Sequence, residues 1–191
     1  MKLENKNKIL PQFISLFSFA LALTILFLSM RAVMKIGGYC AEGGPYVITV
    51  HCPKGISILM PLSIFLLIPS FSVYGMNKID KGPNYTILFW SFVFALLGWN
   101  FLEFGILGTP DQRGIVIGWL ICAFVFFLFG LGPIILFGPK KTLSFLVGYE
   151  GDEYSPKILP FTKERMILVT IHILALITGI ILGILLFIYF T

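Results

Sequence analysis

The sequence contains few charged residues. Asp, Glu, Lys and Arg make up 12% of its 191 residues, whereas 58% belong to the hydrophobic set. About a quarter of the residues in an average soluble domain are charged, so this chain cannot cover a water-exposed surface. The composition excludes a soluble globular protein, a disordered chain, a coiled coil and a nucleic-acid-binding domain. It predicts an integral membrane protein.

The common catalytic signatures are absent as well. No Walker A, H-E-x-x-H, G-x-S-x-G or G-x-G-x-x-G pattern occurs. The chain has only two histidines, which gives little support to histidine-based haem or metal chemistry. No inverted repeat of the kind found in many transporters is visible. We therefore expect no cofactor and favour a protein that is not an enzyme.

Five apolar stretches are long enough to cross a hydrocarbon core, which takes about 20 helical residues. Helices are expected because every backbone polar group in lipid must be satisfied internally. The first stretch is followed by no A-x-A cleavage site, so we interpret it as an uncleaved helix. The predicted fold is one all-α membrane domain over residues 1–191, with an outer loop at 31–55 and an inner loop at 139–165. The expected spans are residues 13–30, 56–76, 85–108, 115–138 and 166–190.

The positive charges favour one orientation of this bundle. With a cytoplasmic N-terminus, ten of the 14 Lys and Arg residues lie on the cytoplasmic side and four lie outside. The positive-inside rule therefore predicts the N-terminus inside and the C-terminus outside. Arg31 and Lys35 are exceptions, because they lie close to the outer end of the first span.

The outer loop contains two cysteines. Cys40 and Cys52 enclose 11 residues, and a pair outside the cytoplasm at this spacing predicts a structural disulfide. Such a bond would stabilise the protein by about 3 kcal/mol. A redox-active pair is an alternative, although the C-x-x-C spacing is missing. A metal site is another, with only His51 and Glu42 as nearby ligands. Tyr46–Val50 predicts a short extended segment, for which a small β-hairpin is one form.

The same loop resembles a loop in known proteins. The pattern R-A-V-M-x2-G-G-x-C-A-x-G-G-P-Y, followed by C-P, runs from Arg31 to Pro53. It resembles a loop of small multi-span bacterial membrane proteins known mainly as uncharacterised open reading frames. The resemblance implies a bacterial envelope protein, and it implies no activity. We expect a multi-pass protein of the cytoplasmic membrane.

The third span contains a carboxylate near its expected outer end. Burying an acid within a span costs about 2.5–3.5 kcal/mol, less near the interface. Glu103 lies close enough to the surface to pair with Arg31, Lys35 or Arg113, which would hold the outer loop on the bundle. Asn100 lies one turn deeper on the same side. In the alternative, Glu103 and Asn100 handle an ion or a substrate.

The fifth span contains a histidine. His172 lies six residues into this span, near the inner end, and is not expected to touch Glu103. A hydrogen bond to a neighbouring helix is the expected role. A proton relay is the alternative.

Small residues four apart mark helix-packing faces. The fifth span has Ala175, Gly179 and Gly183, and Gly114 and Gly118 lie around the start of the fourth. These faces predict either packing inside the bundle or contact with a partner subunit or a second copy.

The inner loop has basic ends and an acidic middle. Leu143–Val147 is apolar but too short to span, so we expect it at the membrane interface. The basic ends are expected near anionic lipid head groups. A solvated connector is the expected role of the rest.

Three hypotheses of function remain open. The first is an accessory, regulatory or assembly subunit that acts through its outer loop and helix faces. The second is a small transporter or channel that uses Glu103 and Asn100. The third is a membrane enzyme with thiol–disulfide activity at Cys40 and Cys52. The expected partners are the lipid bilayer and a membrane protein or second copy, and nucleic acid is not expected.

Overall fold

The computed structural model describes residues 3–38, 40, 50–109, 114–150, 157–160 and 162–191. Within these residues each of five helices is long and apolar enough to cross a membrane. This confirms the predicted helical architecture. The helices are α1 (Leu3–Lys35), α2 (Ile56–Met76), α3 (Thr86–Leu107), α4 (Ile117–Val147) and α5 (Lys163–Phe190). A two-stranded antiparallel ladder of β1 (Tyr149–Glu150) and β2 (Lys157–Ile158) lies between α4 and α5.

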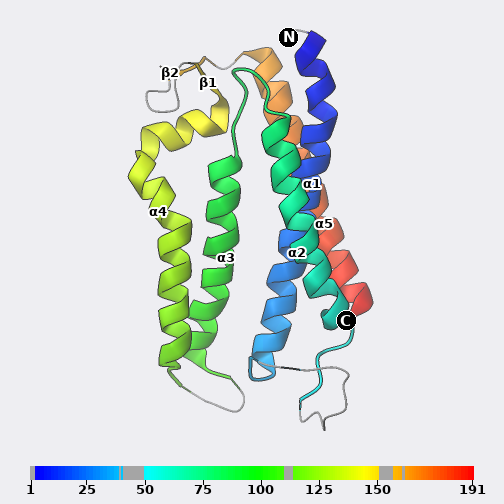
Figure 1. The fold of residues 1–191 in the computed structure, drawn as a ribbon, viewed down its shortest axis with the longest axis vertical. Coiled ribbons are helices and arrows are strands. Elements are labelled where there is room, and N and C mark those ends of the chain that lie inside the picture. Colours follow the sequence, from blue (N-terminus) through cyan, green and yellow to red (C-terminus); the bar gives the residue numbers. More distant parts are fainter. Residues whose placement is uncertain (1–2, 39, 41–49, 110–113, 151–156, 161) are drawn as a thin grey trace.

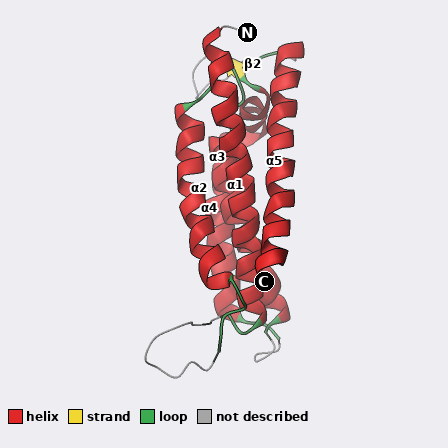
Figure 2. Ribbon diagram, turned by 90° about the vertical axis from the view of Figure 1, so that its right-hand side faces the viewer, coloured by secondary structure: helices red, strands yellow, loops and turns green. Residues whose placement is uncertain are grey.

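The helices form two groups (Figure 1). Helix α1 packs along both α2 and α5, while α3 packs along α4. Helix α3 touches α1 and α2 over shorter stretches. Figure 2 shows the helices running side by side. The N-terminus, the α2–α3 turn and the β ladder lie at one end, here called the N-terminal end, and the C-terminus lies toward the other.

Helix α1 is longer than the predicted first span. It begins before residue 13, contains Pro11, and ends at Lys35. Arg31 and Lys35 therefore lie on a helix and not in a loop. Hydropathy marks only the apolar part of a helix, whereas the hydrogen-bonded backbone continues into its polar ends.

Helix α4 bends where the predicted fourth span ends. Gly138 has a positive φ of 76°, which glycine adopts readily, and Pro139 begins the next helical piece. The piece from Pro139 to Val147 turns away from the axis of α4 (Figure 1). The inner loop therefore begins as a helix, which the hydropathy pattern did not predict.

The core lies where α1, α2, α3 and α5 meet. Phe19 of α1 stacks on Phe89 of α3 with ring centroids 4.0 Å apart, and Tyr74 of α2 lies 5.0 Å from Phe89. Many large apolar side chains of α2, α4 and α5 are exposed instead. Water disfavours an apolar surface of this extent, whereas lipid accepts it.

Candidate functional site

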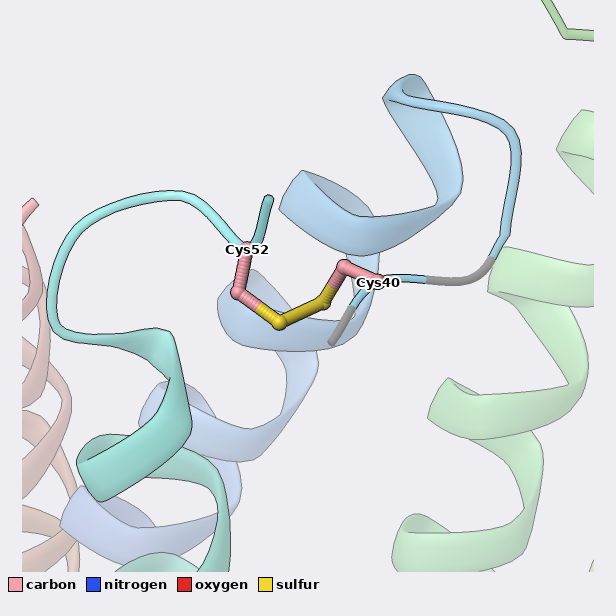
Figure 3. The surroundings of a disulfide bond; sticks show 2 residues. All are labelled: Cys40 and Cys52. Atoms are coloured by element: carbon pink, nitrogen blue, oxygen red, sulfur yellow. A yellow bond between two sulfur atoms is a disulfide. The ribbon is translucent and has the colours of Figure 1, made fainter. Parts of the chain in front are cut away.

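The disulfide joins the two ends of the outer loop. Cys40 and Cys52 are bonded, with their Cα atoms 4.8 Å apart (Figure 3). The bond ties the segment after α1 to the segment before α2, which confirms the predicted pair. Glu42, and the predicted extended segment apart from Val50, lie outside the described residues.

An ion pair joins α1 to α3. Both Nη atoms of Arg31 donate to the carboxylate of Glu103, each at 2.6 Å. Arg31 Nη1 also lies 3.3 Å from Asn100 Oδ1, and Asn100 Nδ2 donates to the carbonyl of Phe27 at 3.2 Å. The guanidinium carbon lies 5.5 Å from the ring centroid of Phe104. The guanidinium of Arg31 thus makes a bidentate hydrogen-bonded ion pair and, at the same time, a cation–π contact with Phe104.

This geometry selects one of the three basic partners that the sequence allowed for Glu103. Arg31 makes the pair, and Arg113 lies outside the described residues. The side chains of Arg31 and Glu103 are 24% and 28% exposed, so the pair is mostly withdrawn from solvent. Any ligand that uses Glu103 must displace the guanidinium.

A second polar cluster lies toward the N-terminal end. The side chain of His172 is fully buried, and its Nε2 lies 3.0 Å from Gln12 Oε1. Gln12 Nε2 donates to the carbonyl of Asn77 at 3.0 Å. The ring of Tyr85 meets His172 edge-on at 5.4 Å between centroids. The cluster joins α5, α1 and the turn after α2.

The acceptor at Asn77 determines the tautomer of His172. A backbone carbonyl only accepts hydrogen bonds, so the amide nitrogen of Gln12 faces it and the amide oxygen faces His172. His172 Nε2 therefore carries a hydrogen and donates it. His172 thus makes a hydrogen bond to a neighbouring helix, α1. Gln12 was missed because the predicted span began one residue later.

The tyrosine beside this cluster fixes the α2–α3 turn. Tyr74 Oη donates to the carbonyl of Pro83 at 3.0 Å and accepts from the backbone N–H of Tyr85 at 3.2 Å. Tyr85 is the N-cap residue that directly precedes α3. The start of α3 is thereby tied to the side of α2.

The small residues of α5 pack against α1. A Cβ atom at Gly179 would lie against the carbonyl oxygen of Phe17 and 2.9 Å from the Cβ of Ala20. One at Gly183 would lie 2.9 Å from the Cβ of Thr24. Ala175 is fully buried. The ladder serves packing inside the bundle.

The two glycines predicted as a packing face at the fourth span, Gly114 and Gly118, are not packed against another helix in the described part of the chain. No described atom lies within 4 Å of a Cβ built at Gly114 or Gly118. Helix α4 instead meets α3 at Gly98, Gly105 and Gly130, where an added Cβ would lie 2.8–3.1 Å from a neighbouring atom. Glycine spacing alone did not separate the packed positions from the open ones.

Comparisons with protein-family models, with curated proteins and with solved structures find no match. The two polar clusters therefore have to be interpreted from their own geometry. Both join helices to each other through charge-assisted or buried hydrogen bonds, which is chemistry that holds a bundle together.

Proposed function

We propose that this chain is a five-span protein of the bacterial cytoplasmic membrane that works as a non-enzymatic accessory, regulatory or assembly subunit. The observation that carries the proposal is the use of the polar groups within the helices. Arg31, Asn100 and Glu103 join α1 to α3, and Gln12 and His172 join α1 to α5. Polar residues in these roles stabilise a bundle, which leaves its outside for contacts with other molecules.

The membrane placement has two supports. Five helices have the length and hydropathy of spans, and their outward faces are apolar. Among the described residues, the N-terminal end carries nine Lys and Arg residues against four Asp and Glu. The positive-inside rule assigns that end to the cytoplasm.

Two features on the outside of the bundle support binding of a partner protein. The outer loop is closed by a disulfide, which reduces the entropy that it loses on binding. Near the start of α4, Gly118 faces open space and Ile117 and Ile121 are exposed. A small residue among large apolar ones lets another helix approach closely in lipid. We propose this face of α4 and the outer loop as the contact surface for a membrane-protein partner or a second copy.

The test is affinity purification in mild detergent with mass spectrometry of the bound proteins. We expect one partner, or a second copy, at fixed stoichiometry. Gly118→Leu should remove it without changing thermal stability. Gly75→Leu is the matched control, because Gly75 also faces open space but lies on α2. A single species without a partner, or a partner that survives Gly118→Leu and replacement of the outer loop, contradicts the proposal.

A transporter that uses Glu103 is the second candidate. The observation that favours it is the partial exposure of the Arg31–Glu103 pair, which leaves part of the carboxylate surface open to an ion that displaces the guanidinium. Purified protein in liposomes should then show a flux that Glu103→Gln abolishes. The absence of flux across a broad set of ions and solutes would contradict this candidate.

A further inference from the structure

A pocket opens at the N-terminal end of the bundle. It has a volume of about 300 Å³ and is lined by Lys8 of α1, by Lys78, Asp80 and Lys81 of the α2–α3 turn, and by Glu150 of β1. Three segments far apart in the sequence thus bring three ammonium groups and two carboxylates to one place. No catalytic or packing role described above uses this pocket.

The charges in the pocket are partly engaged with each other. Lys81 pairs with Glu150, and the ammonium group of Lys81 holds the pKa of that carboxyl below its usual range. Lys8 Nζ lies 3.4 Å from the carbonyl oxygen of Lys78, so this side chain reaches from α1 to the α2–α3 turn. Lys8 and Lys78 thus line the same pocket, together with Asp80.

The bent end of α4 is joined to the loop that forms this pocket. The backbone N–H of Asn84 donates to the carbonyl of Phe145 at 2.8 Å. The Cα of Gly148 lies so close to the carbonyl of Lys81 that a Cβ there would be 2.6 Å from its oxygen. The segment Pro139–Val147 and the pocket are thus parts of one end surface.

The bent segment Pro139–Val147 indicates at which level of the membrane the pocket lies. Leu143 and Leu146 are exposed on it, and Lys140 precedes them on the chain. Helices that combine exposed apolar and basic residues lie at the boundary between head groups and acyl chains. The pocket at the same end therefore lies at the level of the lipid phosphates.

An exposed apolar surface lies along α2, the helix that precedes the loop of the pocket. Phe65, Ile68 and Met76 are exposed along α2, and Met76 precedes Lys78 by two residues. A lipid bound in the pocket could lay an acyl chain on this face. A free phosphate ion would lack that contact and would still meet the carboxylates of Asp80 and Glu150 in the lining.

We propose that the pocket binds the phosphate of an anionic phospholipid of the cytoplasmic leaflet, with Lys8 and Lys78 as its phosphate-binding residues. Lysine ammonium groups are established phosphate binders. Basic pockets at the cytoplasmic ends of membrane helices bind acidic head groups. The inference rests on the membrane placement proposed above, and it does not depend on a protein partner.

The test is a titration of the purified protein in detergent micelles, followed by native mass spectrometry. The probes are dioleoyl phosphatidylglycerol, phosphatidylethanolamine and phosphatidylcholine, each measured separately, and inorganic phosphate as a competitor. We expect phosphatidylglycerol to bind more tightly than the two zwitterionic lipids. Lys8→Gln and Lys78→Gln should each weaken its binding about five-fold.

Two further variants separate a site from general surface charge. Lys163→Gln makes the same charge change at the same end, at the start of α5 and outside the pocket lining, and should leave binding unchanged. Glu150→Gln removes the carboxylate that engages Lys81 and should tighten binding by a few fold. Lys8→Arg should restore the binding that is lost in Lys8→Gln. Thermal unfolding without lipid checks that each variant is folded.

Three results would overturn the inference. Equal weakening by Lys163→Gln and the pocket variants would show diffuse attraction to the whole end. Full competition by inorganic phosphate at the lipid concentration would show a site for free anions. Equal binding of phosphatidylcholine would show that charge is not recognised. None of these results bears on membrane orientation, which reporter fusions test separately.

Discussion

At the scale of single residues, the Arg31–Glu103 pair shows how this chain accommodates charge inside a helix bundle. Each partner alone would be costly in a low-dielectric setting, because an unpaired charge loses its hydration. The fork of Arg31 satisfies both carboxylate oxygens, and Asn100 and the ring of Phe104 surround the guanidinium. We therefore expect the largest loss of stability when only one of the two residues is replaced.

Glu103→Gln should lower the free energy of unfolding by about 1–3 kcal/mol, since it leaves the guanidinium without its carboxylate. Arg31→Gln should have a similar effect. The double variant should lose less than the sum of both, with a coupling energy of about 0.5–3 kcal/mol. Unfolding in detergent micelles measures all three. Lys35→Gln, at an exposed position one turn further along α1, is the control and should change little. Additive effects of the two substitutions would show that the pair does not couple the helices.

At the scale of elements, the contact between α1 and α5 depends on missing side chains. The glycine ladder of α5 allows the backbones to approach until Gly179 lies against the carbonyl of Phe17. In lipid, close approach is a main source of helix association, because the hydrophobic effect no longer separates inside from outside. Two glycines and one alanine thus allow α5 to approach α1 closely.

Gly179→Ala should destabilise the protein by about 1–3 kcal/mol, because its Cβ would overlap the backbone of α1. Gly118→Ala makes the same change at a position with open space and should stay within about 0.5 kcal/mol of the wild type. Thermal unfolding in micelles checks both. Equal effects at the two positions would contradict the packing described for α5.

The disulfide acts on another pair of elements, the end of α1 and the start of α2. The bonded cysteines are separated by 12 positions, so Cys40→Ser/Cys52→Ser should lower stability by about 3 kcal/mol in the chain-entropy model. Alkylation of the unfolded protein should modify one cysteine, Cys122, before reduction and three after it. If the bond is structural, the double variant keeps its function. Loss of function at unchanged stability would instead favour thiol–disulfide chemistry.

At the scale of the whole molecule, the two ends differ in charge and in construction. The N-terminal end combines the start of α1, the α2–α3 turn, the bent end of α4 and the β ladder (Figure 1). The other end carries the disulfide loop and the α3–α4 connection. If all five helices cross a membrane, as proposed above, their odd number places the two termini on opposite sides.

Reporter fusions test this arrangement. A reporter active only outside the cytoplasm should be active when fused after Thr191 and inactive when fused after Gly148. A reporter that fluoresces only in the cytoplasm should give the reverse result. The physical reason is the concentration of Lys and Arg around the N-terminal end. The opposite pattern at both sites would reverse the proposed orientation.

Local patterns allowed the five helices and the disulfide to be predicted from the sequence. Length and hydropathy decide whether a helix is long and apolar enough to span, and both are properties of a single segment. Cys40 and Cys52 lie close together in the chain, so their pairing needs little information from the fold. The end of α1 was predicted less well, because Lys35 is polar and hydropathy does not follow a helix beyond its apolar part.

The sequence by itself thus determined the helical class of fold, the approximate positions of the five apolar helices and the Cys40–Cys52 disulfide. Only the tertiary structure decided that Arg31 pairs with Glu103, that His172 meets Gln12 across 160 positions, and that Gly179 packs while Gly118 does not. The physical reason is that a side chain's partner depends on which helices are neighbours and on their rotation. Those are relations between segments, and no property of one segment specifies them.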